Sequence, residues 1–289
     1  MEILIEILKD TTLDSLKLLP FLFVSYLIIE LIEHKSSDKM KRYLIKSGKF
    51  GSILGALFGV VPQCGFSVTA ATLFSSGVIT VGTLISVFIS TSDEAILVLL
   101  SSPQSISKIF PLILVKVCFA ILVGIIIDLF VLKNKNKKEV LGDYDKHTHD
   151  VCSSCKCDEN IFISVLKHTF SIFIFIFIFS LVINIIIALI GEENLSKLLL
   201  SGSMFQPIVA GLIGLIPNCA ASVLLTELYI QGVVSFASVI AGLSVGSGVG
   251  LIVLFRQNKD MKQNLKIMLT TFSASVIFGI LIEIIEVIL

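Results

Sequence analysis

Two short stretches of the chain carry a proline, a side-chain amide, a cysteine and a serine in the same order. The first is VVPQCGFS at 60–67, and the second is LIPNCAAS at 215–222. A proline inside an apolar helix breaks the hydrogen-bond ladder, because it has no backbone N–H. The freed backbone groups, the amide, the thiol and the hydroxyl are then available to a small solute. We predict that both stretches bind the same substrate, through Pro62, Gln63, Cys64, Ser67, Pro217, Asn218, Cys219 and Ser222.

The two stretches belong to one unit that occurs twice, at a constant offset of 155 residues (217 − 62 = 155). Without a gap, the same offset pairs Ser92 with Ser247, and Asp128 with Glu283. A repeat at a fixed offset defines the architecture and is considered before local features. The alternative is a proline kink with small residues for helix packing. That alternative does not explain why P-[QN]-C-x-x-S occurs twice.

A polar run, TSDE at 91–94, interrupts the apolar segment 78–100. A carboxylate inside a bilayer costs several kcal/mol, so the acids found there usually face a cavity and have a function. The run therefore predicts three more residues of the substrate site, which are Ser92, Asp93 and Glu94. Alternatively, the acids form a structural ion pair with Lys108 or Lys116, and Lys116 could instead extend to the membrane surface.

The second copy has small residues where the first has these acids. Asp93 and Glu94 fall on Gly248 and Val249, within the sequence GLSVGSGVG. Small residues allow helix backbones to pack closely in a membrane. We expect a full span at 233–255. Glu227, two turns after the second P-N-C motif, is a further candidate for the substrate site.

A hydrophilic segment at 133–160 contains HTHDVCSSCKC. Cysteines and histidines at this density are typical of sites for soft metals, although no second cysteine pair follows at zinc-finger spacing. We predict that the segment captures or senses metal, and the alternative is a solvated tether. Its candidate ligands are His147, His149, Cys152, Cys155 and Cys157, and the candidate metal ligands in the apolar segments are Cys64, Cys219, Asp93 and Glu94.

The composition identifies the environment of these residues. Of the 289 residues, 55% are hydrophobic and 15% are charged, and the mean hydropathy is +0.99. Several apolar runs reach about 20 residues, which is enough to span a hydrocarbon core of about 30 Å. The sequence therefore predicts an all-α polytopic membrane protein. A net charge of zero gives no reason to expect nucleic acid. No phosphate-binding loop, Ser/His/Asp set or H-E-x-x-H motif is present, so we predict neither an enzyme nor a bound cofactor.

Loop charges predict the topology. Lysine and arginine are dense at 34–49, 133–167 and 256–266, and sparse at 103–108 and 191–203. The positive-inside rule places the first three segments in the cytoplasm and the last two outside. The broken segment 51–76 must then enter and leave on one side. At about 39 Å of helix it is too short for two full crossings, which favours a re-entrant hairpin.

The same count places the second hairpin on the opposite side of the membrane. We therefore predict two inverted repeats, each with three full spans and one broken re-entrant hairpin, or about ten helices in all. The first repeat covers 1–132, a cytoplasmic linker covers 133–160, and the second repeat covers 161–289. Inverted repeats with discontinuous helices bind solutes near the midplane. The two hairpin tips should meet there, with Cys64 close to Cys219.

Two long segments carry a family resemblance. They are GALFGVVPQCGFSVTAATLFSSGVITVGTLISVFISTSDEAI and GLIGLIPNCAASVLLTELYIQGVVSFASVIAGLSVGSGVGLIVLFR. They resemble the signature of a bacterial family of ten-span heavy-metal exporters, variously named arsenic efflux proteins or manganese transporters. The resemblance covers nearly the whole chain, and it implies export of a metal or metalloid. Ten spans are obtained when each hairpin is counted as two.

These observations together predict a secondary active transporter that exports a heavy-metal ion or metalloid across the bacterial inner membrane, coupled to protons. Thiols suit thiophilic species such as arsenite, whereas carboxylate, amide and hydroxyl oxygens suit manganese. We favour a divalent cation, because neutral arsenite does not need buried acids. The rival predictions are a metal-gated channel and a membrane thiol oxidoreductase that uses Cys152 and Cys155.

Overall fold

The computed structural model describes residues 50–61, 65–92, 95–101, 106–134 and 203–288, with scattered positions in 8–27 and 165–185. This described part of the chain is helical and contains no strand. One of its helices runs over Phe50–Gly59. The others are α3 (Gly65–Ser75), α4 (Val81–Ser90), α5 (Ala95–Ser101), α6 (Ile106–Asn134), α10 (Gln206–Gly214), α11 (Cys219–Ile230), α12 (Phe236–Val245), α13 (Val249–Gln257) and α14 (Met261–Ile288).

The helices of the first repeat recur in the second with the sequence offset of 155. Adding 155 to the bounds of α4 gives 236–245, which are the bounds of α12. Shifted in the same way, α3, α5 and α6 match α11, α13 and α14 to within one residue at each end. The repeat detected in the sequence is therefore a repeat of helices. The orientation of the two copies in a membrane, and so their inversion, stays a prediction.

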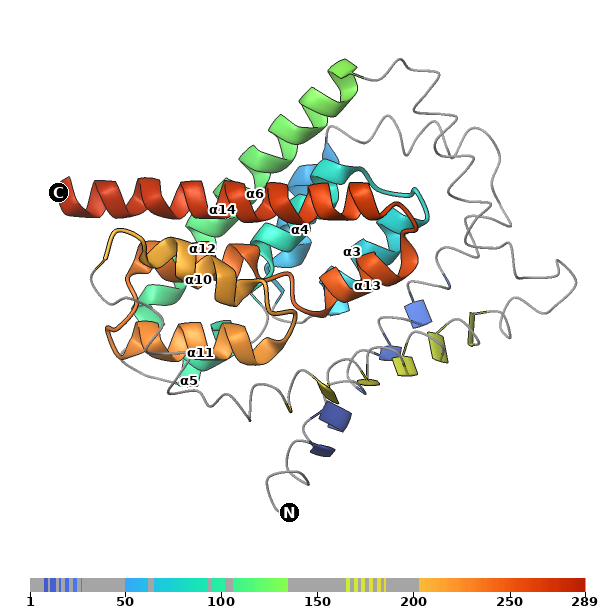
Figure 1. The fold of residues 1–289 in the computed structure, drawn as a ribbon, viewed down its shortest axis with the longest axis horizontal. Helices are drawn as coiled ribbons and strands as arrows, with labels where there is room; N and C mark the ends of the chain where they lie inside the picture. The colour runs from blue at the N-terminus through green and yellow to red at the C-terminus, as the bar shows by residue number, and fades with distance from the viewer. Residues whose placement is uncertain are drawn as a thin grey trace, which may run out of the picture.

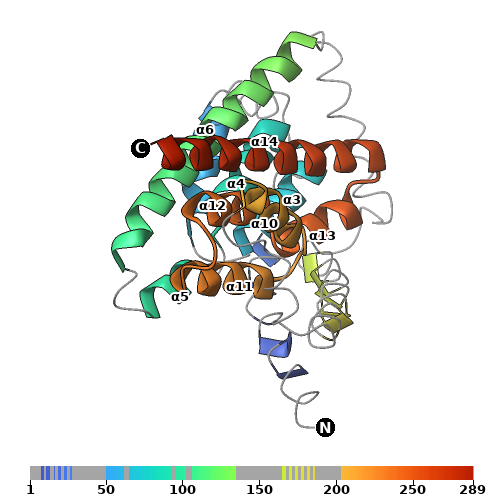
Figure 2. The same cartoon turned by 60° about the vertical axis from the view of Figure 1, so that its left-hand side comes forward.

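The two copies are interlocked. Helix α3 packs against α13, and its equivalent α11 packs against α5, so the second helix of each hairpin contacts the other copy (Figures 1 and 2). Within each copy, α4 packs along α6, and α12 packs along α14. The rings of Phe119 and Phe278 also stack between α6 and α14, with their centroids 4.0 Å apart. Part of the helix packing of each copy is therefore formed with the other copy.

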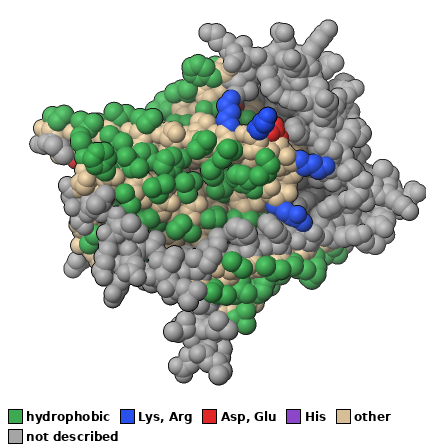
Figure 3. All heavy atoms as spheres, viewed as in Figure 1, with side chains coloured by type: hydrophobic (Ala, Val, Ile, Leu, Met, Phe, Trp, Pro, Cys, Tyr) green, Lys and Arg blue, Asp and Glu red, His purple; other side chains and the backbone are tan. Residues whose placement is uncertain are grey.

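The discontinuous helices are central and the long helices are peripheral. In the apolar stretch of α12–α13 that is long enough to span a membrane, 83% of the residues are buried, against 33% in α6 and 28% in α14. Exposed apolar side chains recur along α14 at intervals of one or two turns, as Leu265, Leu269, Ile277, Leu281 and Ile285 show. Figure 3 shows this green surface along α14, with lysine and arginine side chains gathered at one end. An apolar surface of this length is suited to lipid.

An acid of each long helix binds the start of the neighbouring discontinuous helix. The N-cap of α4 is Thr80, whose hydroxyl donates to Asp128 of α6 at 2.9 Å. The N-cap of α12 is Ser235, whose hydroxyl donates to Glu283 of α14 at 2.6 Å. These residues are equivalent under the offset (80 + 155 = 235 and 128 + 155 = 283). Each acid therefore fixes a helix N-terminus, where negative charge is favoured.

We predict that Asp128→Ala destabilises the fold by about 2–4 kcal/mol, because Asp128 also accepts from Ser52 Oγ at 3.0 Å and Gly82 N at 2.9 Å. Asp128→Asn should lose less, since its amide oxygen still accepts. Thermal unfolding of the purified protein measures both changes. The matched variant Glu283→Ala should be milder, because only one hydrogen bond to Glu283, from Ser235, is found in the described residues. Equal stability of Asp128→Ala and the unsubstituted protein would contradict the prediction.

The expected span at 233–255 is present as an apolar segment of membrane-spanning length over Phe236–Gln257, but it consists of two helices. Helix α12 ends at Val245 and α13 begins at Val249. The three residues between them are Gly246, Ser247 and Gly248, of which Gly248 has a φ of 53° and a ψ of −140°. Only glycine adopts this backbone conformation without strain. Both copies are therefore broken at the same place, since α4 ends at Ser90 and α5 begins at Ala95.

Candidate functional site

The two breaks of the second copy form one small pocket. The hairpin break between α10 and α11 contributes Ile216 and Asn218, and the break between α12 and α13 contributes Gly246 and Gly248. The remaining lining residues are Gly214, Ala221, Ser222, Leu225, Gly242 and Leu243. The pocket has about 210 Å³ of empty space, which includes space open to the outside. Its free space admits about one water-sized molecule.

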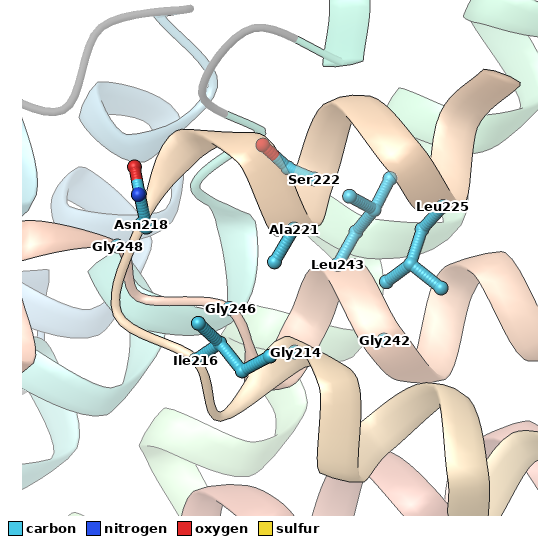
Figure 4. A pocket seen from close by; sticks show the side chains of 10 residues that line it. All are labelled: Gly214, Ile216, Asn218, Ala221, Ser222, Leu225, Gly242, Leu243, Gly246 and Gly248. Carbon is cyan, nitrogen blue, oxygen red and sulfur yellow. The ribbon is translucent and has the colours of Figure 1, made fainter. Parts of the chain in front are cut away.

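Figure 4 shows how the chain forms this pocket. The backbone leaves α10 after Gly214, passes Asn218 and turns back into α11, so α10 and α11 lie on the same side of the break. The amide of Asn218 and the hydroxyl of Ser222 lie at one edge, whereas Ile216 and Leu225 form the apolar part. The predicted hairpin motif therefore supplies the polar groups of the pocket. Pro217 is half-buried between two lining residues.

A close backbone approach holds the hairpin against the broken helix. A Cβ at Gly214 would lie 2.2 Å from the carbonyl oxygen of Gly242. At the equivalent position of the first copy, a Cβ at Gly59 would lie 2.7 Å from the carbonyl oxygen of Val87. Helices can come this close only where glycine leaves out the side chain. The first helix of each hairpin thus ends against the last turn of a discontinuous helix, which is α4 in the first copy and α12 in the second.

The other predicted site residues are placed as follows. Ser67 is fully buried in α3, where a Cβ added at Gly250 of α13 would lie 2.8 Å from its backbone. Ser92 is buried and its hydroxyl donates to the carbonyl of Ser90 at 3.3 Å. Glu227 is exposed on α11 and does not line the pocket.

Several predicted residues lie outside the part of the chain that the structure describes. They are Pro62, Gln63, Cys64, Asp93, Glu94, His147, His149, Cys152, Cys155 and Cys157, and for Cys219 only the backbone is described. The predicted meeting of Cys64 with Cys219 is therefore untested. Among the described residues, no group of three or more His, Cys, Asp or Glu side chains converges as a metal site would require.

A comparison with protein families decides the class of the protein. The family described as "Putative, 10TM heavy-metal exporter" matches residues 1–193 and 158–287, which together cover nearly the whole chain. The chain belongs to this family. The resemblance seen in the sequence is thereby confirmed, together with a multi-pass membrane protein of a heavy-metal exporter family. No curated protein and no solved structure matches the chain.

The four glycines of the lining were not predicted as site residues, although Gly214, Gly242, Gly246 and Gly248 form much of it. The signal was present in GLSVGSGVG, where two glycines flank a serine inside an apolar span.

One side chain of the first copy contacts a residue that lines the pocket. Lys116 of α6 is fully buried, and its Nζ donates to the carbonyl oxygen of Leu243 at 3.0 Å and to that of Thr91. Leu243 lines the pocket. Because Lys116 is buried, it does not extend to the membrane surface. Lys108 precedes Lys116 on α6 by about two turns, and its Nζ lies 4.6 Å from the ring centroid of Tyr229 in α11.

Proposed function

We propose that this member of the family is a secondary active transporter that exports a heavy-metal ion across the bacterial inner membrane. The observation that carries the proposal is the small pocket where two discontinuous segments meet. Helix ends and unwound backbone at such a place supply groups for a solute. Non-helical backbone inside a membrane is tolerated where protein or a wet cavity covers it. The breaks at 215–218 and 246–248 are non-helical backbone of this kind, and both contribute residues to the pocket.

The lengths of the half-helices support two re-entrant hairpins in inverted repeats. The helix Phe50–Gly59 has 10 residues and α3 has 11. Helices of these lengths are about 15–16 Å long, which is half of a core of about 30 Å. Helices α10 and α11, with 9 and 12 residues, repeat the arrangement. Each hairpin then enters from its own side of the membrane and ends near the centre.

A divalent cation such as manganese is the substrate we favour. Asn218, Ser222 and the backbone carbonyls at the breaks are oxygen donors, which suit hard cations. In the first copy, Gln63, Asp93 and Glu94 would add donors of the same kind, and one of the two acids would carry the coupling proton. The predicted soft-metal linker, with His147 and Cys152 among its ligands, would capture metal for delivery.

Arsenite is the second candidate, and Lys116 favours it. The ammonium of Lys116 contacts the carbonyl of Leu243, which lines the pocket. A positive charge next to the pocket lining opposes the binding of a cation unless carboxylates balance it, but it does not oppose the binding of neutral arsenite. Cys64 and Cys219 would then be the ligands, because thiols bind thiophilic species.

Flux measurements in proteoliposomes test the proposal. We expect uphill accumulation of manganese when a pH gradient is imposed and its loss when an ionophore collapses the gradient. Accumulation of arsenite without manganese would select the second candidate. Downhill metal flux whose rate does not depend on the pH gradient would indicate a metal-gated channel instead. Absence of flux for both substrates would contradict the proposal, with empty liposomes as the control for leakage.

A further inference from the structure

Lys116 is a cation in the most buried part of a membrane protein. It is the eleventh residue of the 29-residue helix α6, and none of its surface is exposed. A charged lysine within a membrane helix is costly, so it is found where specific partners compensate the charge. Snorkelling is excluded by its burial, and its partners therefore explain why it is tolerated.

Two of its partners, both in the described part of the chain, are carbonyl groups at the ends of two helices. Thr91 is the C-cap of α4, and Leu243 lies in the last turn of α12, which ends at Val245. The last carbonyls of a helix have no partner within the helix and carry the negative end of its dipole. Lys116 Nζ donates to both carbonyl oxygens. Its charge is therefore matched to two negative helix ends.

The two helices are equivalent elements of the two copies. Helices α4 and α12 are related by the offset of 155 and pack against each other. Lys116 itself has no lysine counterpart, because 116 + 155 is Thr271, whose hydroxyl donates to Ile267 of its own helix at 2.9 Å. One ammonium thus serves both helix ends. It binds the two copies together where both discontinuous helices stop.

Carbonyl oxygens at the C-terminal ends of discontinuous helices form the cation sites of many transporters. We propose that the ends of α4 and α12 form a monovalent cation site, and that the chain occupies this site with the ammonium of Lys116. The ligand class is a small monovalent cation, such as ammonium, an alkylammonium or an alkali ion. The inference goes beyond metal export, because it concerns an ion that is part of the chain and is not transported.

The test removes the tethered ion and supplies a free one. Full-length protein with Lys116→Ala is purified in detergent, and its unfolding temperature is measured in methylammonium, ammonium, sodium or potassium chloride. N-methylglucamine, which is too large for the site, maintains the ionic strength. We expect the unfolding temperature to fall by about 5–10 °C and to recover by at least half, saturably, with one of the small cations. The unsubstituted protein should not respond.

Two variants are controls for the cavity and for lysine removal in general. Lys116→Met fills the space of the side chain with an apolar group, so it should be destabilised without rescue. Lys108→Ala removes a lysine of the same helix that lies over Tyr229, and small cations should not raise its unfolding temperature. Rescue confined to Lys116→Ala supports the site. Lack of rescue, or Lys116→Met as stable as the unsubstituted protein, overturns it.

If Lys116→Ala does not accumulate, Lys116→Gln and Lys116→Arg carry the test. Glutamine keeps a hydrogen-bond donor without the charge, whereas arginine keeps the charge. The proposal requires Lys116→Arg to be the more stable of the two. Lys116→Gln as stable as the unsubstituted protein overturns the proposal. Because unfolding temperature is the readout, the outcome is independent of whether the protein transports a metal.

Discussion

Metal export should fall by up to about 100-fold when Asp93 is replaced by Asn or Glu94 by Gln, if the substrate is a hard divalent cation. A contact between a charged ligand and its partner is worth up to about 3 kcal/mol, which corresponds to roughly 100-fold in affinity. Both changes remove charge but keep shape. Initial export rates in everted vesicles, normalised to the amount of folded protein, measure the effect.

The thiols provide the opposite comparison. Cys64→Ser and Cys219→Ser keep size but replace a soft donor with an oxygen, so they should only raise the concentration needed for half-maximal export. If the substrate is thiophilic, the order of the effects reverses. Asp128→Asn is the matched control, because it changes a buried acid that binds a helix N-terminus away from the pocket. Equal and mild effects of all four changes would mean that the hairpins are only structural.

Gly248→Ala should abolish most transport at a modest cost in stability. Gly248 lines the pocket with a φ of 53° and a ψ of −140°. An alanine there is strained by about 1–3 kcal/mol, and the break is expected to relax away from the geometry that forms the pocket. We expect the export rate to fall at least about tenfold, since about 1.4 kcal/mol already changes an equilibrium tenfold. Rate and unfolding temperature are measured on the same preparation.

Gly232→Ala separates backbone strain from the site. Gly232 also has a positive φ, 77°, but it follows α11 at the far end from the pocket, and a Cβ there meets nothing within 4 Å. It should lower the unfolding temperature and leave the export rate per folded protein unchanged. Equal loss of export in both glycine variants would show that general destabilisation, not the pocket, causes the defect.

The breaks differ in how well the sequence predicted them. The interruption at 91–94 was visible as acids in an apolar run, and the break at 215–218 was visible as a proline. The break after Val245 was missed, because Gly246, Ser247 and Gly248 also suit close packing of a continuous helix. Glycine permits an unusual backbone conformation without requiring it. Whether a glycine adopts that conformation depends on the residues packed around it.

For Asp128, Glu283 and Lys116 too, the sequence predicted part of their role and the structure supplied their partners. The offset alone paired Asp128 with Glu283, but their hydrogen bonds to Thr80 and Ser235 join residues 48 positions apart. For Lys116 the sequence left the membrane surface and an ion pair as alternatives. The structure excludes the membrane surface and shows carbonyl partners 25 and 127 residues away, whereas the ion pair with Asp93 or Glu94 falls on residues outside the described part of the chain. No local pattern encodes partners at such distances.

The sequence by itself determined the membrane class, the duplication with its offset of 155, the first polar break and the hairpin motif that lines the pocket of the second copy. These are local or periodic properties, because apolar run length, proline and a repeated order of residues act within one segment. Only the tertiary structure decided that α3 packs on α13 while α11 packs on α5, and that one ammonium lies at the ends of both α4 and α12. Such contacts depend on which apolar faces are buried together, and helices that are all apolar satisfy many pairings equally well until backbone approach at Gly214 or Gly250 selects one.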